Sequence, residues 1–196
     1  MKKKWIVIVV VVVVILLLYS SVKGTFNQMV TLGEAVDGQW ANVENVYQRR
    51  ADLIPNLVAT VKGYASHEEE TLTAVIEARA KATSVNINPG DINSTSIQQF
   101  QQAQSGITSA LSKLMVVVER YPDLKANQNF LDLQSQLESS ENRISTERRK
   151  YNETTRVYNT LIKQFPKNIY AGIFNFDEKS YFEAENTAKE VPKVEF

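Results

Sequence analysis

Apolar residues follow two patterns along this chain, one unbroken and one periodic. Every residue in 6–18 is Val, Ile or Leu, and Trp5 and Tyr19 flank the run. With the three residues after Tyr19 it reaches about 18 residues, near the lower limit for crossing a hydrocarbon core about 30 Å thick. Aromatic residues at both ends of such a run are typical of membrane interfaces. The pattern predicts a transmembrane anchor over 5–22, behind a basic tail over 1–4.

A cleaved secretory signal also combines a basic start with an apolar run, so it is the alternative to an anchor. The nearest candidate cleavage site is Val22-Lys23-Gly24, which lacks the A-x-A pattern. We therefore expect the segment to remain as a single-pass transmembrane helix. Three lysines precede the run and one follows it, which favours a cytoplasmic N-terminus and a bundle outside the cytoplasm.

From Phe26 onward, apolar positions recur at alternating steps of three and four, the pattern of helices that bury one face. Pro55 predicts a break, because proline cannot donate a hydrogen bond to the preceding turn. A capping-box spacing over 95–98 predicts the start of a later helix. The predicted helices cover about 26–54, 55–84, 95–121 and 126–165. Since each has one stripe to bury, the sequence predicts an all-α fold with an antiparallel four-helix bundle of long helices, packed like a coiled coil, over 24–165.

The central part of the last long helix is less apolar than its ends. Ser140, Glu147 and Arg148 fall near its buried seam, and buried charges need partners. Two Tyr-Asn pairs one heptad apart, at 151/152 and 158/159, predict core tyrosines with hydrogen-bonding neighbours. We expect ion pairs between the seam and charged residues on other helices. The candidates are Arg49, Arg50, Asp52, Glu68 and Arg79.

The composition changes after Pro166, where aromatic residues alternate with small and polar ones. Such a segment, 166–182, either packs its aromatics against the bundle or offers them to a partner. The candidate partner-binding aromatics are Tyr170, Phe174, Phe176, Tyr181 and Phe182. The last stretch, 183–196, is charged and contains Pro192, which predicts a disordered tail.

Composition excludes several classes of function. Lys and Arg number 22 and Asp and Glu also number 22, so no net field favours nucleic acid. There is no cysteine and one histidine, His67, which argues against a metal site, and we interpret His67 to Glu70 as a solvated helix face. No phosphate-binding or nucleophile motif occurs, so we expect no cofactor and no enzymatic activity. An enzyme that uses only carboxylates, such as Asp52 or Glu68, is the remaining catalytic alternative.

Residues 49–58, Arg-Arg-Ala-Asp-Leu-Ile-Pro-Asn-Leu-Val, and the following segment 61–68 resemble the central signature of the LemA family. Tyr121 to Ala126, Glu141 to Arg148 and Phe165-Pro166 fit the remaining family pattern in order. The resemblance extends from the apolar run to about Phe182. It implies a bacterial cell-envelope protein with one transmembrane helix, a helical bundle and no established enzymatic activity. Some family members are described with the opposite membrane orientation.

Two functional hypotheses follow. The first is a membrane-tethered scaffold or adaptor that recruits another envelope protein; its oligomeric state is open. The second is a ligand-sensing or accessory subunit that modulates a membrane protease or a signalling system. It requires a pocket between helices, for which the polar candidates are Arg49, Asp52, Asn56, Tyr64 and Glu68.

Overall fold

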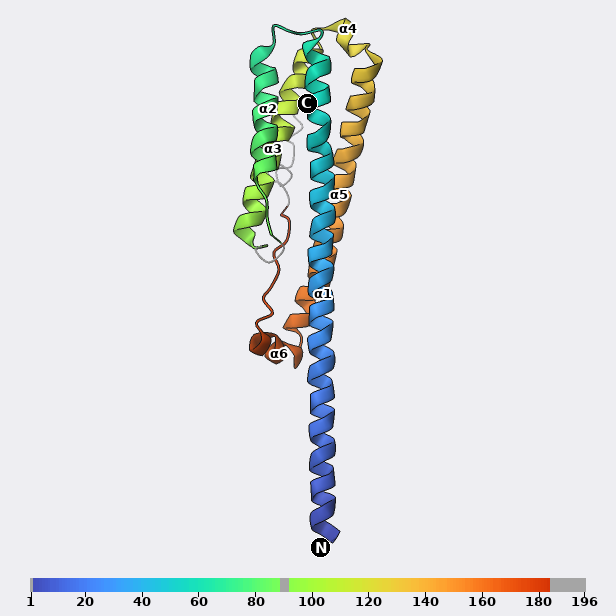
Figure 1. Cartoon of the computed structure of the whole chain (residues 1–196), viewed down its shortest axis with the longest axis vertical. Helices are drawn as coiled ribbons and strands as arrows, with labels where there is room; N and C mark the ends of the chain where they lie inside the picture. Colours follow the sequence, from blue (N-terminus) through green and yellow to red (C-terminus); the bar gives the residue numbers. More distant parts are fainter. Residues whose placement is uncertain (1, 89–91, 184–196) are drawn as a thin grey trace, which may run out of the picture. The chain divides into compact units, whose positions relative to one another are not determined.

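A computed structural model of the chain describes residues 2–88 and 92–183, and within these ranges all regular structure is helical. The helices are α1 (Lys2–Lys62), α2 (Glu69–Ser84), α3 (Ser94–Val118), the single turn α4 (Pro122–Lys125), α5 (Gln128–Lys163) and α6 (Lys167–Phe174) (Figure 1). The all-α prediction is confirmed. Apart from Glu183, the predicted disordered tail lies outside the described residues.

The chain divides into two compact units, and α1 and α5 each contribute to both. The first unit contains Met1–Gly38 and Glu153–Lys179, and the second contains Gln39–Asn152 and the residues from Ser180 on. In the second unit, α2 and α3 lie on one side of the later part of α1 in this view, and the earlier part of α5 lies on its other side (Figure 1). Their periodic apolar residues form one buried cluster, as the stripes in the sequence predict. Its most deeply buried members include Ile54, Leu57, Val61, Val75, Ile107, Leu114, Leu124 and Phe130.

The predicted break at Pro55 is wrong, because α1 continues through Pro55 to Lys62. A proline inside a helix leaves the carbonyl four residues earlier without its usual N–H donor. Here that carbonyl belongs to Ala51, and the Arg79 Nε of α2 donates to it at 2.8 Å. The guanidinium of a neighbouring helix therefore replaces the missing backbone donor, and the helix does not need to end.

The reversal of the chain instead occupies residues 63–68, between α1 and α2. Its backbone is held by short-range bonds such as that from the Ala65 N–H to the Val61 carbonyl, at 2.8 Å. The start of α3 also differs from the expected position. Asn93 is the N-cap and exchanges hydrogen bonds with Ser96, so the capping box begins two residues before the predicted one at Thr95.

In the first unit, the early part of α1 leaves its apolar run uncovered. Large apolar side chains from Trp5 to Tyr19 are 47–70% exposed, and the helix is long and apolar enough to cross a membrane. Further along, Met29 and Val36 are fully buried. Tyr158 of α5 lies against Gly33, since a Cβ at Gly33 would lie 3.7 Å from the tyrosine ring.

Candidate functional site

A buried arginine organises the polar part of the second unit. The Arg50 side chain is 3% exposed and donates from Nη1 to Glu141 at 2.8 Å and from Nη2 to the Gln104 side chain at 2.8 Å. The Thr108 hydroxyl accepts a longer bond of 3.3 Å. The Arg50 guanidinium of α1 thus binds both α3 and α5. An ion pair joins α1 to α5, but it does not use the predicted seam residues.

The residues in that pair are not those nearest the seam in the sequence. Glu141, rather than Glu147 or Arg148, binds Arg50, while Glu147 accepts a bond from Gln39 at 2.7 Å. That bond and a neighbouring lysine lower the pKa of the Glu147 carboxyl, with the Lys150 hydrogen bond as the larger cause. The seam carboxylate of Glu147 is therefore satisfied by a hydrogen bond from α1 and by an ion pair within α5.

The five polar candidates do not meet at one place. Arg49, Asp52 and Asn56 are exposed along one side of α1, and the Asp52 carboxylate accepts a hydrogen bond from Gln48 within the same helix. The other two, Tyr64 and Glu68, lie within the 63–68 reversal. They bind the region around α4: Tyr64 accepts from Asn127 at 2.9 Å, and Glu68 accepts from Tyr121 at 2.9 Å and from Arg120 at 3.0 Å. As a shared ligand site, the set stays a prediction.

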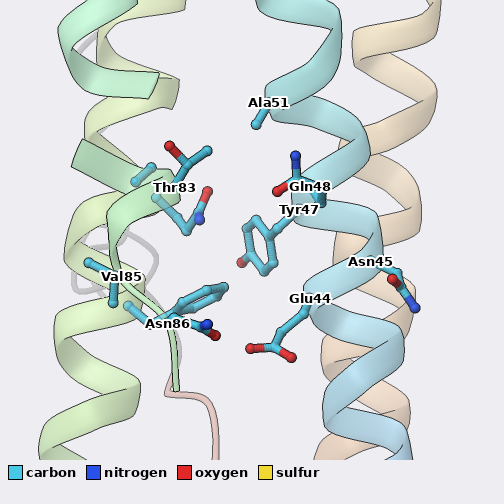
Figure 2. A pocket seen from close by; sticks show the side chains of 11 residues that line it. Glu44, Asn45, Tyr47, Gln48, Ala51, Thr83, Val85 and Asn86 are labelled. Carbon is cyan, nitrogen blue, oxygen red and sulfur yellow. The ribbon is translucent and has the colours of Figure 1, made fainter. Parts of the chain in front are cut away.

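A cavity of about 250 Å³ lies elsewhere, between α1, the end of α2 and α3. Figure 2 shows the Glu44 carboxylate and the Tyr47 ring pointing into it, whereas the Asn45 amide points away. None of the five candidates lines it. Its lining residues are Glu44, Asn45, Tyr47, Gln48, Ala51, Ala82, Thr83, Val85, Asn86, Phe100 and Gln104.

The Glu44 carboxyl is the one acidic group in this lining. Burial raises its pKa above the ordinary value, because a carboxylate loses hydration there. The Trp40 indole N–H is buried and makes no hydrogen bond with any described atom, and its attraction for the carboxylate lowers the pKa by less. The cavity therefore carries a half-buried acid that a bound cation would stabilise.

The spacing of polar and small residues beside the apolar stripe of α1 could have indicated this cavity. Glu44, Gln48 and Ala51 are spaced by four and three residues, so they share a side of α1 with the core residue Tyr47. Polar residues beside the stripe and a small residue within it, Ala51, indicate a locally underfilled interior. Among the described residues, no three His, Asp or Glu side chains are close enough together to hold a metal ion.

The first Tyr-Asn pair of α5 binds an extended segment, residues 177–182, which we call the strap. Asn152 donates to the Phe182 carbonyl at 3.0 Å and accepts from the Phe182 N–H at 2.8 Å. Tyr151 is fully buried and donates to the Ser180 carbonyl at 3.0 Å. An asparagine amide offers a donor and an acceptor side by side, so it pairs with an extended residue as a neighbouring β-strand would.

The second pair repeats this arrangement in the first unit. Asn159 donates to the Lys179 carbonyl at 2.8 Å and accepts from the Lys179 N–H at 2.9 Å, and Tyr158 donates to the Asp177 carbonyl at 3.0 Å. Seven residues of helix rise about 10 Å, and three residues of extended chain cover about the same length. The heptad spacing of the pairs therefore matches a three-residue spacing on the strap. The predicted core tyrosines with hydrogen-bonding neighbours are confirmed.

The candidate partner-binding aromatics are divided between buried and exposed positions. Phe182 is 5% exposed and stacks on Trp40 with ring centroids 5.6 Å apart. Phe174 and Phe176 pack edge-on against Phe26, at 5.0 and 5.5 Å. Of the two alternatives for segment 166–182, packing against the chain's own helices applies to these three rings. Tyr181 remains 38% exposed.

Comparison with known proteins gives a consistent grouping. A model of the LemA family matches residues 39–196. Magnetosome protein MamQ 2 of Paramagnetospirillum magneticum is 28% identical, over 86% of this chain and 68% of that protein. Protein LemA of Metamycoplasma hominis is 24% identical, over 82% of this chain and 70% of that protein.

Proposed function

The chain belongs to the LemA family, and from that premise we propose that it is a membrane-anchored scaffold of the bacterial cell envelope. One observation carries the proposal. The exposed apolar run and the buried face that begins at Met29 belong to a single uninterrupted helix, α1. The same element therefore offers a surface that needs lipid and a surface that needs protein.

The anchor is supported by the cost of leaving the run in water. Burying one Val, Leu or Ile side chain contributes roughly 1.5–3 kcal/mol, and the run from Trp5 to Tyr19 consists almost entirely of such residues. A bilayer removes this cost for all of them together. The family match begins at Gln39, so the anchor is inferred from the apolar run itself.

A scaffold is favoured over an enzyme by the way the buried polar groups are used. The Nη atoms of Arg50 donate to Glu141, Gln104 and Thr108. The side-chain amides of Asn152 and Asn159 bind the strap. These polar groups bind neighbouring helices and the strap to one another, so their role in the fold is structural.

The partner is proposed to be another envelope protein that meets the exposed edge of the strap at Tyr181. A photoreactive phenylalanine analogue placed at Tyr181 in the full chain tests this in living cells. We expect one discrete adduct with a protein of the membrane fraction. The matched control is Leu131, which is 42% exposed on α5 and should give no such adduct. Adducts of equal yield at both positions, or at neither, contradict the proposal.

The second unit is proposed to lie outside the cytoplasm, on the basis of the lysines before the run. Because the chain has no cysteine, single-cysteine variants report topology directly. A membrane-impermeant maleimide should label Ser139→Cys on intact spheroplasts, and Lys3→Cys only after permeabilisation. The reverse pattern would place the second unit in the cytoplasm.

A second candidate function, binding of a small ligand, is favoured by the Glu44 cavity. Its half-buried carboxyl and the Tyr47 ring suit a small primary or quaternary ammonium compound, because aromatic faces and carboxylates both attract cations. A panel of amines and amino acids tested by thermal shift should raise the melting temperature of the wild-type chain and not of Glu44→Gln. Equal shifts for both chains, or no shift with any amine, would reject it.

A further inference from the structure

An apolar surface gathers around α6 in the first unit. Ile169 and Ile173 are 50% and 65% exposed, and Phe165, in the turn just before the helix, is 81% exposed. Two residues four apart lie on the same side of a helix, so Ile169 and Ile173 form one face. Ala171, on the other side, is 5% exposed. Water-soluble surfaces rarely gather large apolar side chains in this way.

This surface belongs to the same unit as the apolar run and joins α1 close to where that run ends. Phe174, the last residue of α6, packs against Phe26 with ring centroids 5.0 Å apart. Phe26 follows Lys23, the first charged residue after the run, by less than one helical turn, or about 5 Å of rise. If the run crosses the bilayer, this contact holds α6 at the depth of the lipid headgroups, a layer roughly 5–8 Å thick on each side.

We propose that α6 and the Phe165 turn insert into the headgroup layer of the bilayer and bind the lipid surface beside the anchor. The inference rests on the proposed anchor and gives that anchor a second, lateral contact with the membrane. A short helix with an apolar face at the membrane boundary commonly lies in the plane of the interface. In Figure 1, α6 turns away from the end of α5 and lies to one side of α1, with its axis turned away from the axis of α1.

The charges around α6 fit an anionic lipid surface. Lys167 is the first residue of α6, and Lys23 lies on α1 three residues before Phe26, which contacts the last residue of α6. After α6, Glu178 pairs with Lys163 and Lys179 pairs with Asp37, whereas Asp177 forms no ion pair with a described residue. Lys23 forms no ion pair with a described residue, and Lys167 donates only a long bond of 3.5 Å to the Gln164 side chain, so both ammonium groups can turn to lipid phosphates.

The test uses the full chain reconstituted in vesicles of phosphatidylcholine and phosphatidylglycerol. Since the chain has no cysteine, Ile173→Cys carries one environment-sensitive fluorophore. The matched control is Val157→Cys on α5, an apolar position of the same unit that is 41% exposed. Val157 adjoins Tyr158, which meets Gly33 about two helical turns beyond Phe26. Val12→Cys, within the run, reports the anchor independently.

We expect the Ile173 label to shift to the blue and to be quenched most strongly by headgroup nitroxides, because an interfacial helix buries its apolar face by roughly 5–10 Å. Nitroxides near the bilayer centre should quench it less and should quench the Val12 label most. The Val157 label should remain unquenched by either.

Three outcomes would overturn the proposal. An Ile173 label that behaves like the Val157 label, while Val12 is quenched deeply, places α6 in water and leaves the anchor intact. A blue-shifted Ile173 label that no lipid nitroxide quenches indicates a protein contact, either with a second copy or with a partner. Loss of quenching at Val12 as well would reject the anchor itself, and with it the premise of the inference.

Discussion

The apolar cluster of the second unit and the strap cover the long helices by different chemistry. In the cluster, side chains such as Leu57 and Leu114 exclude water through contacts that have no preferred direction. The strap is extended backbone whose N–H and C=O groups need partners, and Asn152 and Asn159 supply them at 2.8–3.0 Å. A periodic pattern of apolar residues is therefore enough to form the cluster. The strap, by contrast, depends on particular side chains at particular positions, such as Asn152 and Asn159.

The largest expected loss of stability comes from a substitution in the apolar cluster of the second unit. Leu114→Ala should lower the free energy of unfolding by about 2–5 kcal/mol, because a fully buried leucine leaves a cavity that the neighbours fill only in part. Urea unfolding followed by circular dichroism measures the loss. The control is Val116→Ala on the same helix, 71% exposed, which should change stability by less than about 0.5 kcal/mol.

A substitution that detaches the strap should lower the free energy of unfolding by less than Leu114→Ala does. Its main effect should be faster hydrogen exchange of the strap amides. Asn152→Ala removes two hydrogen bonds and leaves the Phe182 backbone unpaired, at about 1–3 kcal/mol. Hydrogen exchange should accelerate at the Phe182 amide while the amides of α3 stay protected. Asn152→Asp keeps the acceptor and removes the donor, so its Phe182 amide should exchange at an intermediate rate.

Asn142→Ala, at an exposed position of the same helix, is the matched control and should leave the exchange of Phe182 unchanged. Uniform acceleration across the whole second unit in Asn152→Ala would show that the strap and the cluster unfold together. In that case the strap would not unfold independently of the apolar cluster.

Directional bonding also occurs within the apolar region, at Pro55. Arg79→Met should cost about 1–3 kcal/mol, because the buried Ala51 carbonyl then has no donor. In a Pro55→Ala background the residue 55 N–H bonds that carbonyl, so the same change should cost less. A double-mutant cycle by urea unfolding measures the difference. Equal costs in both backgrounds would contradict the compensation.

The smallest effect is expected at Glu44 and depends on pH. Burial raises the pKa of this carboxyl in the folded state, so the folded chain favours the neutral acid. Stability from this group is therefore complete below its ordinary pKa and declines as pH rises through the folded-state value. Glu44→Gln should melt at a higher temperature than the wild type at neutral pH and at the same temperature near about pH 3. A difference that persists at low pH would exclude titration as its cause.

The helices were predictable from the sequence because their signal is local. Stripe residues such as Val43, Ile54 and Ile107 are buried as their three-and-four spacing requires. The break at Pro55 was predicted wrongly because the compensating donor, Arg79, lies 28 residues away on another helix. No rule based on neighbouring residues detects a bond of that kind.

The polar interior was harder to predict for a similar reason. Arg49 and Arg50 differ by about 100° around the helix, and only the rotation of α1 decides that Arg50 is 3% exposed while Arg49 faces solvent. The Tyr-Asn pairs could be identified as hydrogen-bonding core residues, but their acceptors are backbone groups of the strap. Backbone partners leave no mark in a side-chain pattern, so the strap itself was not predicted.

Alkaline carbonate extraction tests most directly the claim that α1 anchors a folded bundle in a membrane. The comparison is between the full chain and a variant with Val10→Lys and Val12→Lys, two exposed positions within the run. Each lysine near the bilayer centre costs about 2.5–3.5 kcal/mol of insertion. If α1 is the anchor, the wild type stays in the pellet and the variant is released with its bundle folded. Release of the wild type, or retention of both chains alike, would contradict it.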